Sequence, residues 1–166
     1  MKRKCGECSI CCYIGYIPEL EKPTHQWCKN VKTKSCGSCA IHDSKDLPKT
    51  CNDYKCLWLR GYGGDGDRPD DAGVLFSDNV IEEQRYFTAI ETKEGALDGG
   101  GGLKTALEIA RAYPIPMLVV DYGQKPPTTG DRVIIHDKIL HRAKRIAGEL
   151  LVKHDDVGIY ELLKGN

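Results

Sequence analysis

Nine cysteines constrain this chain more than any other feature, because all of them lie within the first 56 of its 166 residues. They form an opening run, a middle group and a closing pair: Cys5, Cys8, Cys11 and Cys12, then Cys28, Cys36 and Cys39, then Cys51 and Cys56. Two residues between cysteines is the spacing at which a tight turn directs both sulfurs to one ion, and repeated pairs of this kind indicate metal binding. The sequence therefore predicts that metal coordination organises the amino-terminal part of the chain.

Two other uses of cysteine compete with metal ligation. A disulfide framework is typical of secreted domains, whereas these cysteines are odd in number and follow Lys2-Arg3-Lys4 without the apolar stretch of a signal peptide. Redox pairs of the Cys-x-x-Cys type normally follow a strand and begin a helix, and residues 1–12 indicate neither. The spacing favours metal ligation over both alternatives.

Apolar content divides the chain into two lobes. Residues 1–60 contain only 12 Val, Ile, Leu, Met, Phe or Trp side chains, which is too few for a short segment to fold without a covalent or metal staple. A Gly-, Asp- and Pro-rich stretch over 61–72 indicates a connection, and the composition of 73–166 is typical of a globular lobe. We expect a cysteine-cluster metal-binding lobe over 1–60, a connection over 61–72 and an α+β lobe over 73–166.

Charge follows the same division, with 11 basic and 6 acidic side chains in residues 1–60 and a formal charge of zero for the whole chain. Metal-bound cysteine is thiolate, so eight ligands on two divalent ions would add four net negative charges and balance these lysines and arginines. Nucleic acid is therefore not an expected partner. No apolar run approaches the ~18 residues of a membrane helix, so the sequence predicts a cytoplasmic protein without a membrane partner.

The remaining residues predict a small sheet with two packed helices, an α+β fold. Aromatic and β-branched runs indicate strands over 73–77, 86–91, 117–120 and 132–135. Apolar residues repeat at helical spacing over 103–113, which Pro114 ends, and again over about 137–153.

Two segments resemble catalytic motifs but do not meet their requirements. Gly99–Gly102 leads into a helix like a phosphate loop, but Leu103 separates the last glycine from Lys104. His136 and His141 are five residues apart, so they do not share a helix face as a metalloprotease pair would; Asp137, His154, Asp155 and Asp156 are their polar neighbours. We therefore expect a flexible turn and a polar surface, with no catalytic residues.

The cysteine pattern resembles the CxxCxxCC cysteine-cluster family, whose members are described as zinc- or iron-chelating. The similarity covers about residues 1–60 and continues through Cys39-Ala40-Ile41-His42 and Leu47-Pro48-x2-Cys51-x4-Cys56. This chain departs from the family at His42, where an aromatic is usual, and at Leu47 and Asn52, where arginine is usual. The resemblance implies metal binding by eight cysteines, with Cys36 as the extra one: Cys5, Cys8, Cys11, Cys12, Cys28, Cys39, Cys51 and Cys56.

Eight thiolates suit two four-coordinate sites, and zinc accepts four thiolates in a tetrahedron. Two zinc ions are the favoured cofactor. An iron–sulfur cluster is the alternative, because Cys5, Cys8 and Cys11 have ferredoxin-like gaps, although the fourth cysteine and proline of that motif are missing. Adjacent Cys11 and Cys12 should point in different directions, so either they serve different sites or only one of them serves a site. Cys36 and His42 are further possible ligands, and His25 could also replace a sulfur.

Together these features predict a non-catalytic, metal-binding structural or interaction module with a protein partner or a place in a larger assembly. Closed four-thiolate sites contribute folding energy and leave no position for a substrate. The alternative is an iron–sulfur redox protein or a metalloenzyme with an open metal position.

Overall fold

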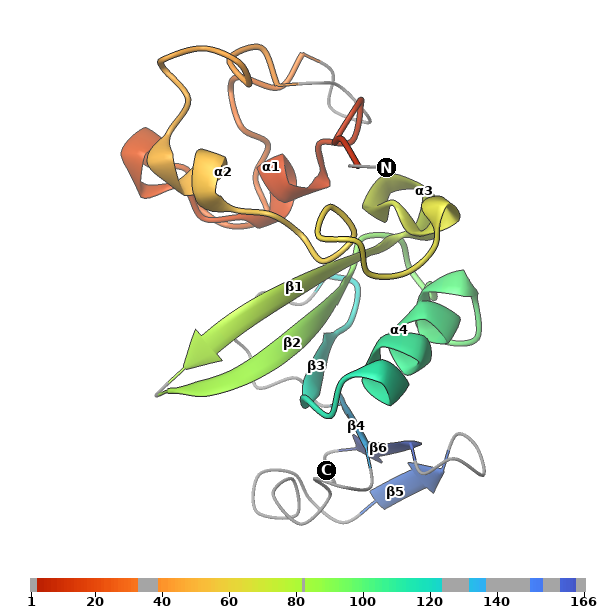
Figure 1. The fold of residues 1–166 in the computed structure, drawn as a ribbon. Coiled ribbons are helices and arrows are strands. Elements are labelled where there is room, and N and C mark those ends of the chain that lie inside the picture. Colours follow the sequence, from red (N-terminus) through yellow and green to blue (C-terminus); the bar gives the residue numbers. More distant parts are fainter. Residues whose placement is uncertain are drawn as a thin grey trace.

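The computed structural model describes residues 3–32, 39–81, 83–123, 132–136, 150–153 and 159–163. These residues form an α+β fold, as the sequence predicts (Figure 1). Short helical turns carry the cysteine-rich part: α1 (Ile10–Ile14), the 3-10 helix η1 (Pro18–Leu20) and α2 (Lys49–Asp53). A second 3-10 helix, η2 (Asp65–Asp67), and α3 (Pro69–Ala72) lie in the segment expected to be a connection. The longest described helix is α4 (Gly101–Ala112).

Six strands form one mixed sheet in the order β1-β2-β3-β4-β6-β5. They are β1 (Val74–Ile81), β2 (Gln84–Glu91), β3 (Met117–Val120), β4 (Arg132–His136), β5 (Leu150–Lys153) and β6 (Ile159–Leu163). The pair β2 and β3 is parallel, with Phe87 opposite Met117, and the other pairs are antiparallel. A parallel pair needs a crossover connection, which α4 provides.

The larger core lies between α4 and one face of the sheet. Val74 and Phe76 of β1 point to this face because side chains alternate along a strand. They pack with residues of β2, β3, β4, α4 and neighbouring loops: Leu57, Phe87, Ala89, Leu97, Ala106, Ile109, Ala110, Met117, Val119 and Ile134. Leu57 follows the last cysteine directly, so the cysteine-rich segment ends inside this core.

A smaller core covers the opposite face of the sheet. Leu75, Ile90 and Val120 point to this face and pack against side chains of the cysteine-rich segment: Ile14, Cys56 and Trp58. In Figure 1 the cysteine-rich segment and α4 lie on opposite sides of β1 and β2. The sheet is therefore the middle layer, and the cysteine-rich segment is one of the two layers that cover it.

The strands expected over 73–77, 86–91, 117–120 and 132–135 are confirmed as β1 to β4, and the helix over 103–113 is confirmed as α4. The prediction of a helix over 137–153 is wrong at its end, where Leu150–Lys153 forms β5; residues 137–149 lie outside the described residues. Leu150 pairs with Leu163 and Leu151 with Leu162, so strand pairing outweighs the helical spacing of the apolar residues there. Strand β6 was not predicted.

None of the helices in the described parts of the chain is long and apolar enough to cross a membrane.

Candidate metal centre

The cysteines lie on short helices and tight turns that backbone hydrogen bonds hold in place. Cys5 and Cys8 form the turn before α1, in which Cys8 N donates to Cys5 O at 3.0 Å. Cys11 and Cys12 lie in α1, and Cys28 N donates to Cys12 O at 3.1 Å, which brings Cys28 back to that helix. The others lie in a bridge to Val31 (Cys39), in α2 (Cys51) and just after α2 (Cys56), and all eight of these thiols are free. Cys36 lies outside the described residues.

Four of the thiols interact around the start of α1, and we call Cys5, Cys8, Cys11 and Cys56 the first quartet. Burial raises the pKa of Cys5, and the charges of Cys56 and Cys12 raise it further. The pKa of Cys11 is raised by its hydrogen bond to Cys12, then by burial and by the charges of Cys12, Cys5 and Cys8. Burial also raises the pKa of Cys8, to about 12. Cys5 is therefore close enough to Cys56 and Cys11, and Cys11 to Cys8, for these pairs to repel each other as thiolates.

The other four thiols interact across α1 and α2, and we call Cys12, Cys28, Cys39 and Cys51 the second quartet. Burial raises the pKa of Cys51 to about 11, together with the charges of Cys12, Cys28 and Cys39. The pKa of Cys39 is also raised by burial, with further contributions from Cys12 and Cys28. Cys12 also interacts with the first quartet, because it shares a hydrogen bond with Cys11. This hydrogen bond lowers the pKa of Cys12 to about 7.

Backbone amides already donate to several of the sulfurs. The N–H groups of Ile10 and Asp70 donate to Cys8, and that of Ile41 donates to Cys39. The N–H groups of Trp58 and Leu59 donate to Cys56. Each donor of this kind lowers the pKa of its thiol and favours thiolate, and donors two residues after a cysteine are the outer-shell hydrogen bonds that orient metal ligands.

The described residues contain no group of three or more His, Cys, Asp or Glu side chains arranged closely enough to hold a metal ion. The chemistry of the two quartets nevertheless fits such an ion, since each supplies the four sulfurs that a structural zinc site uses. Because the described side chains are not arranged closely enough to hold an ion, metal binding would require the thiols of each quartet to move closer together. Beside Cys8, the hydroxyl of Ser9 is buried without a hydrogen-bond partner among the described residues.

Neither histidine that the sequence offered as a ligand belongs to a quartet. The ring of His42 is 57% exposed, and its Nδ1 lies 3.1 Å from Asp43 Oδ1, although its charge acts on Cys12. The ring of His25 packs edge-on against Tyr13, with 5.7 Å between ring centroids.

Sequence reasoning missed the basic side chains beside the quartets. Lys22 is only 5% exposed, and its Nζ donates to the carbonyl oxygens of Tyr13 (3.1 Å), Gly15 and Pro23 (2.8 Å). Arg3 donates to the carbonyl oxygens of Trp58, Tyr62 and Gly63 at 2.7–2.9 Å. An isolated lysine between Glu21 and Pro23 carries no local signal that it will be buried.

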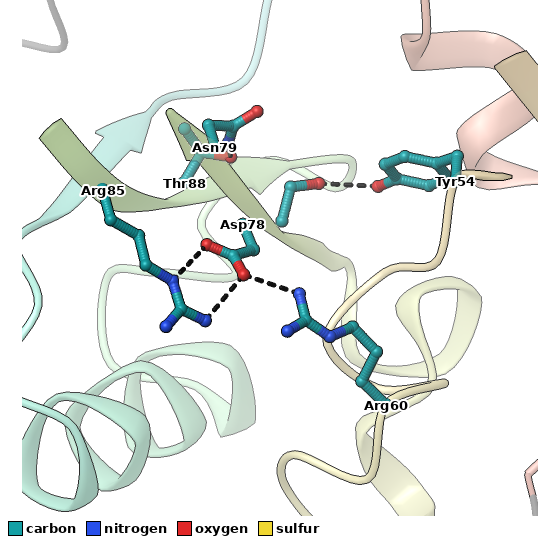
Figure 2. Close-up of polar contacts among 7 residues, drawn as sticks. Tyr54, Arg60, Asp78, Asn79, Arg85 and Thr88 are labelled. Atoms are coloured by element: carbon teal, nitrogen blue, oxygen red, sulfur yellow. Dashed lines mark hydrogen bonds and ion pairs between the residues drawn. The ribbon is translucent and has the colours of Figure 1, made fainter. Parts of the chain in front are cut away.

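A further polar cluster braces the hairpin of β1 and β2. Figure 2 shows the carboxylate of Asp78 between two guanidinium groups, with Arg60 at 2.7 Å and Arg85 at 2.7–2.8 Å. Tyr54 shares a 2.6 Å hydrogen bond with Ser77 of β1. Because Tyr54 and Arg60 flank Cys56, these contacts attach the end of the cysteine-rich segment to the sheet.

The segments that resembled catalytic motifs have other roles where they are described. Gly100 caps α4, and a Cβ on Gly102 would lie 2.4 Å from Val74 Cγ2, so this glycine permits close packing of α4 on β1. Lys104 is exposed and lies 3.9 Å from Glu108. His136 ends β4, while Asp137, His141, His154, Asp155 and Asp156 lie outside the described residues.

A shallow hollow of about 220 Å³ lies where the cysteine-rich segment meets the ends of β2 and β3. Tyr13, His25 and Tyr122 line it together with Glu91, whose carboxylate accepts the N–H groups of Leu97 (2.7 Å) and Tyr122 (2.9 Å). Both carboxylate oxygens of Glu91 are therefore engaged in holding the backbone.

Comparison with protein-family models, with curated proteins and with solved structures finds no match to this chain.

Proposed function

We propose that this protein is a non-catalytic, metal-binding structural module that holds two zinc ions, one in each quartet. Cys5, Cys8, Cys11 and Cys56 would bind one ion, and Cys12, Cys28, Cys39 and Cys51 the other. The observation that carries this proposal is the proximity of eight free thiols, in which Cys12, Cys28, Cys39 and Cys51 interact with one another and Cys5 and Cys11 connect Cys8 and Cys56, with amides already donating to three of the sulfurs. Neither Cys36 nor His42 is needed as a ligand.

The pKa values show why these cysteines would need a cation to bind as thiolates. Burial contributes to the raised pKa values of Cys5, Cys8, Cys11, Cys39, Cys51 and Cys56, and the charges of neighbouring cysteines raise those of Cys5, Cys11, Cys39 and Cys51 further, so a set of four thiolates is unfavourable without a cation. A divalent ion removes that repulsion and replaces the four protons. The same free energy then stabilises the fold around the thiolates.

The two sites would link parts of the chain that are distant in sequence. The first quartet would tie residues 5–11 to Cys56, and the second would tie α1 to α2 through Cys12 and Cys51. Only Ile14, Cys56 and Trp58 of this segment are fully buried against the sheet in the smaller core. Two closed metal sites would therefore supply stability that this small apolar cluster does not.

Four thiolates complete the tetrahedral coordination of zinc, so neither site would have an open position for a substrate. A structural role then needs a surface on which a partner protein can act. Large side chains remain exposed in the described part of the chain, one of them on β1 and the others in the segments between elements: Val80, Tyr16, Tyr54, Tyr113 and Tyr122. We infer that the module serves as an interaction unit within a larger assembly.

Metal content and the absorption spectrum test the proposal on protein purified without air. We expect two zinc ions per chain and no visible colour. Replacing zinc by cobalt(II) should give the intense visible bands of tetrahedral cobalt thiolate centres. Iron with sulfide and a broad absorption band near roughly 400 nm would instead support the iron–sulfur alternative. Absence of metal with oxidised cysteines would overturn the proposal.

A further inference from the structure

Lys22 carries a buried positive charge that pairs with no carboxylate in the described ion pairs. Only 5% of the residue is exposed, and its Nζ is held by three neutral carbonyl groups, those of Tyr13, Gly15 and Pro23. None of the ion pairs in the described part of the chain includes Lys22. A buried ammonium group is unfavourable unless an anion lies close to it.

The second quartet lies where that anion is needed. Tyr13 directly follows Cys12, and Cys28 N donates to Cys12 O, so the carbonyl cradle of Lys22 adjoins the backbone that carries two ligands. The ammonium interacts electrostatically with Cys28, Cys12, Cys11 and Cys51, in that order of strength. Three of these four belong to the second quartet. The backbone fixes the position of Lys22, because it pairs with Ile17 in both directions at 3.0 and 3.1 Å.

The charges that face the two quartets are paired differently. Cys8 of the first quartet interacts with both Asp70 and Arg68, which pair with each other at 2.7 Å, and Cys56 interacts with Arg3, which lies 3.6 Å from Asp65. The second quartet interacts with Lys22, Lys32 and His42, and with one acidic side chain, the fully exposed Glu19. Of these groups, Lys22 is the buried cation without a carboxylate partner, so solvent screens its charge least.

We propose, on the basis of the metal-binding function above, that Lys22 is the fixed counter-ion of the second quartet and makes its metal centre the tighter-binding of the two. A zinc ion with four thiolates carries a net charge of −2, which a buried ammonium group partly neutralises. Both cations beside the first quartet have carboxylate partners, since Arg3 lies 3.6 Å from Asp65 and Arg68 pairs with Asp70 at 2.7 Å. The same protein would then release its two metals at different chelator concentrations.

The test uses the full chain in two backgrounds, each with a single site. Cys5→Ser with Cys8→Ser retains the second quartet, and Cys39→Ser with Cys51→Ser retains the first. Lys22→Gln, which removes the charge and keeps a donor, is introduced into both, and zinc affinity is measured at equilibrium by competition with a chromophoric chelator. We expect the affinity of the second quartet to fall about tenfold or more, with little change in the first.

Two controls separate charge from structure. Lys22→Arg should retain most of the affinity because it keeps the charge, and Lys104→Gln on α4 makes the same change of net charge on the opposite side of the sheet. Equal losses of zinc affinity at both sites in Lys22→Gln, or no loss at either site, would overturn the role of Lys22.

If Lys22→Gln does not fold, the zinc affinities of the two single-site chains that keep Lys22 are compared instead. Tighter binding by the first quartet would then overturn the inference. A chain that binds no metal would overturn the proposed function as well, whereas two equal sites would overturn only this inference.

Discussion

At the scale of single residues, the cysteines of this chain have different positions and therefore different expected roles. Cys56 is buried in the smaller core and accepts N–H groups from Trp58 and Leu59, so we expect it to be a ligand of the first quartet. Cys36 is the cysteine that the resemblance to the CxxCxxCC family leaves over. A matched pair of serine substitutions can therefore separate a ligand from a cysteine that is not a ligand.

We expect Cys56→Ser to reduce the metal content from two ions per chain to one, and Cys36→Ser to leave it at two. The reason is that serine does not replace a thiolate in a zinc site. Elemental analysis of the two purified variants checks this. A loss of metal in Cys36→Ser would show that the ligand set has been assigned wrongly.

Asp78 predicts a pH dependence of stability. Hydrogen bonds from Arg85, and then from Arg60, lower the pKa of this carboxyl to about 2 from its ordinary value of 3.8. A carboxyl whose folded pKa lies below its unfolded pKa stabilises the fold above the unfolded value, and loses this contribution as the pH falls toward the folded value. Its contribution should therefore be complete above about pH 5 and lost between about pH 4 and pH 2.

We expect Asp78→Asn to lower the free energy of unfolding by about 1–2 kcal/mol at pH 6, since Asp78 is only 15% exposed but its arginine partners are partly screened. The difference from the unsubstituted protein should shrink as the pH falls to 2. Urea denaturation at several pH values measures it. Asp43→Asn, at a side chain that is 98% exposed, is the control, and a pH-independent difference for Asp78→Asn would contradict the assignment.

At the scale of elements, the packing of α4 on β1 depends on a missing side chain. A Cβ at Gly102 would lie 2.4 Å from Val74 Cγ2 and 2.7 Å from Ala96 O, closer than atoms can approach. The adjacent Gly101 has open space at the same point. The two glycines of one helix therefore offer opposite outcomes for the same substitution.

We expect Gly102→Ala to destabilise the protein by about 1–3 kcal/mol, because the clash outweighs the gain in helix propensity. Gly101→Ala should be neutral or stabilising by up to about 1 kcal/mol. Thermal or urea denaturation of both variants makes the comparison. Equal effects of the two substitutions would mean that α4 does not approach β1 as closely as described.

At the scale of the whole molecule, the sheet separates two layers that are stabilised differently. The core between α4 and the sheet is the larger apolar cluster, whereas the cysteine-rich layer contributes to the smaller one, and we propose that metal sites stabilise that layer. Removal of metal should therefore affect the layers unequally, and the cysteine-rich layer should lose its structure first.

Hydrogen exchange with and without a chelator measures this difference. We expect the amides of residues 5–32 and 39–56 to lose protection when metal is removed, including those of Gly15 and Cys28, while β2, β3 and α4 remain protected. Addition of zinc should restore the original pattern. Loss of protection in all segments together would show that the two layers unfold as one cooperative unit.

The sequence by itself determined the local structure of β1 to β4 and of α4, because aromatic and β-branched runs favour strands, and apolar residues at helical spacing favour a helix, within each segment alone. It failed at β5 and β6. The apolar residues near Leu150 repeat at helical spacing, and their strand conformation depends on pairing with Ile159–Leu163, a partner that no local pattern reveals. Strand order and the parallel pairing of β2 and β3 likewise depend on contacts between distant segments.

For the candidate site, the sequence by itself indicated metal ligation, because the two-residue gaps at Cys5, Cys8 and Cys11 and at Cys36 and Cys39 are a local property of tight turns, and the family resemblance reduced the expected ligands to eight. Only the tertiary structure decided which cysteines lie together, since the loop of residues 13–27 returns Cys28 to Cys12, and α2 brings Cys51 to the same place while Cys56 lies beside Cys5. It alone also placed the ammonium group of Lys22 beside the second quartet. The physical reason is that the packing around a residue, and not its neighbours in the chain, sets how deeply the residue is buried and how strongly its charge interacts with other groups.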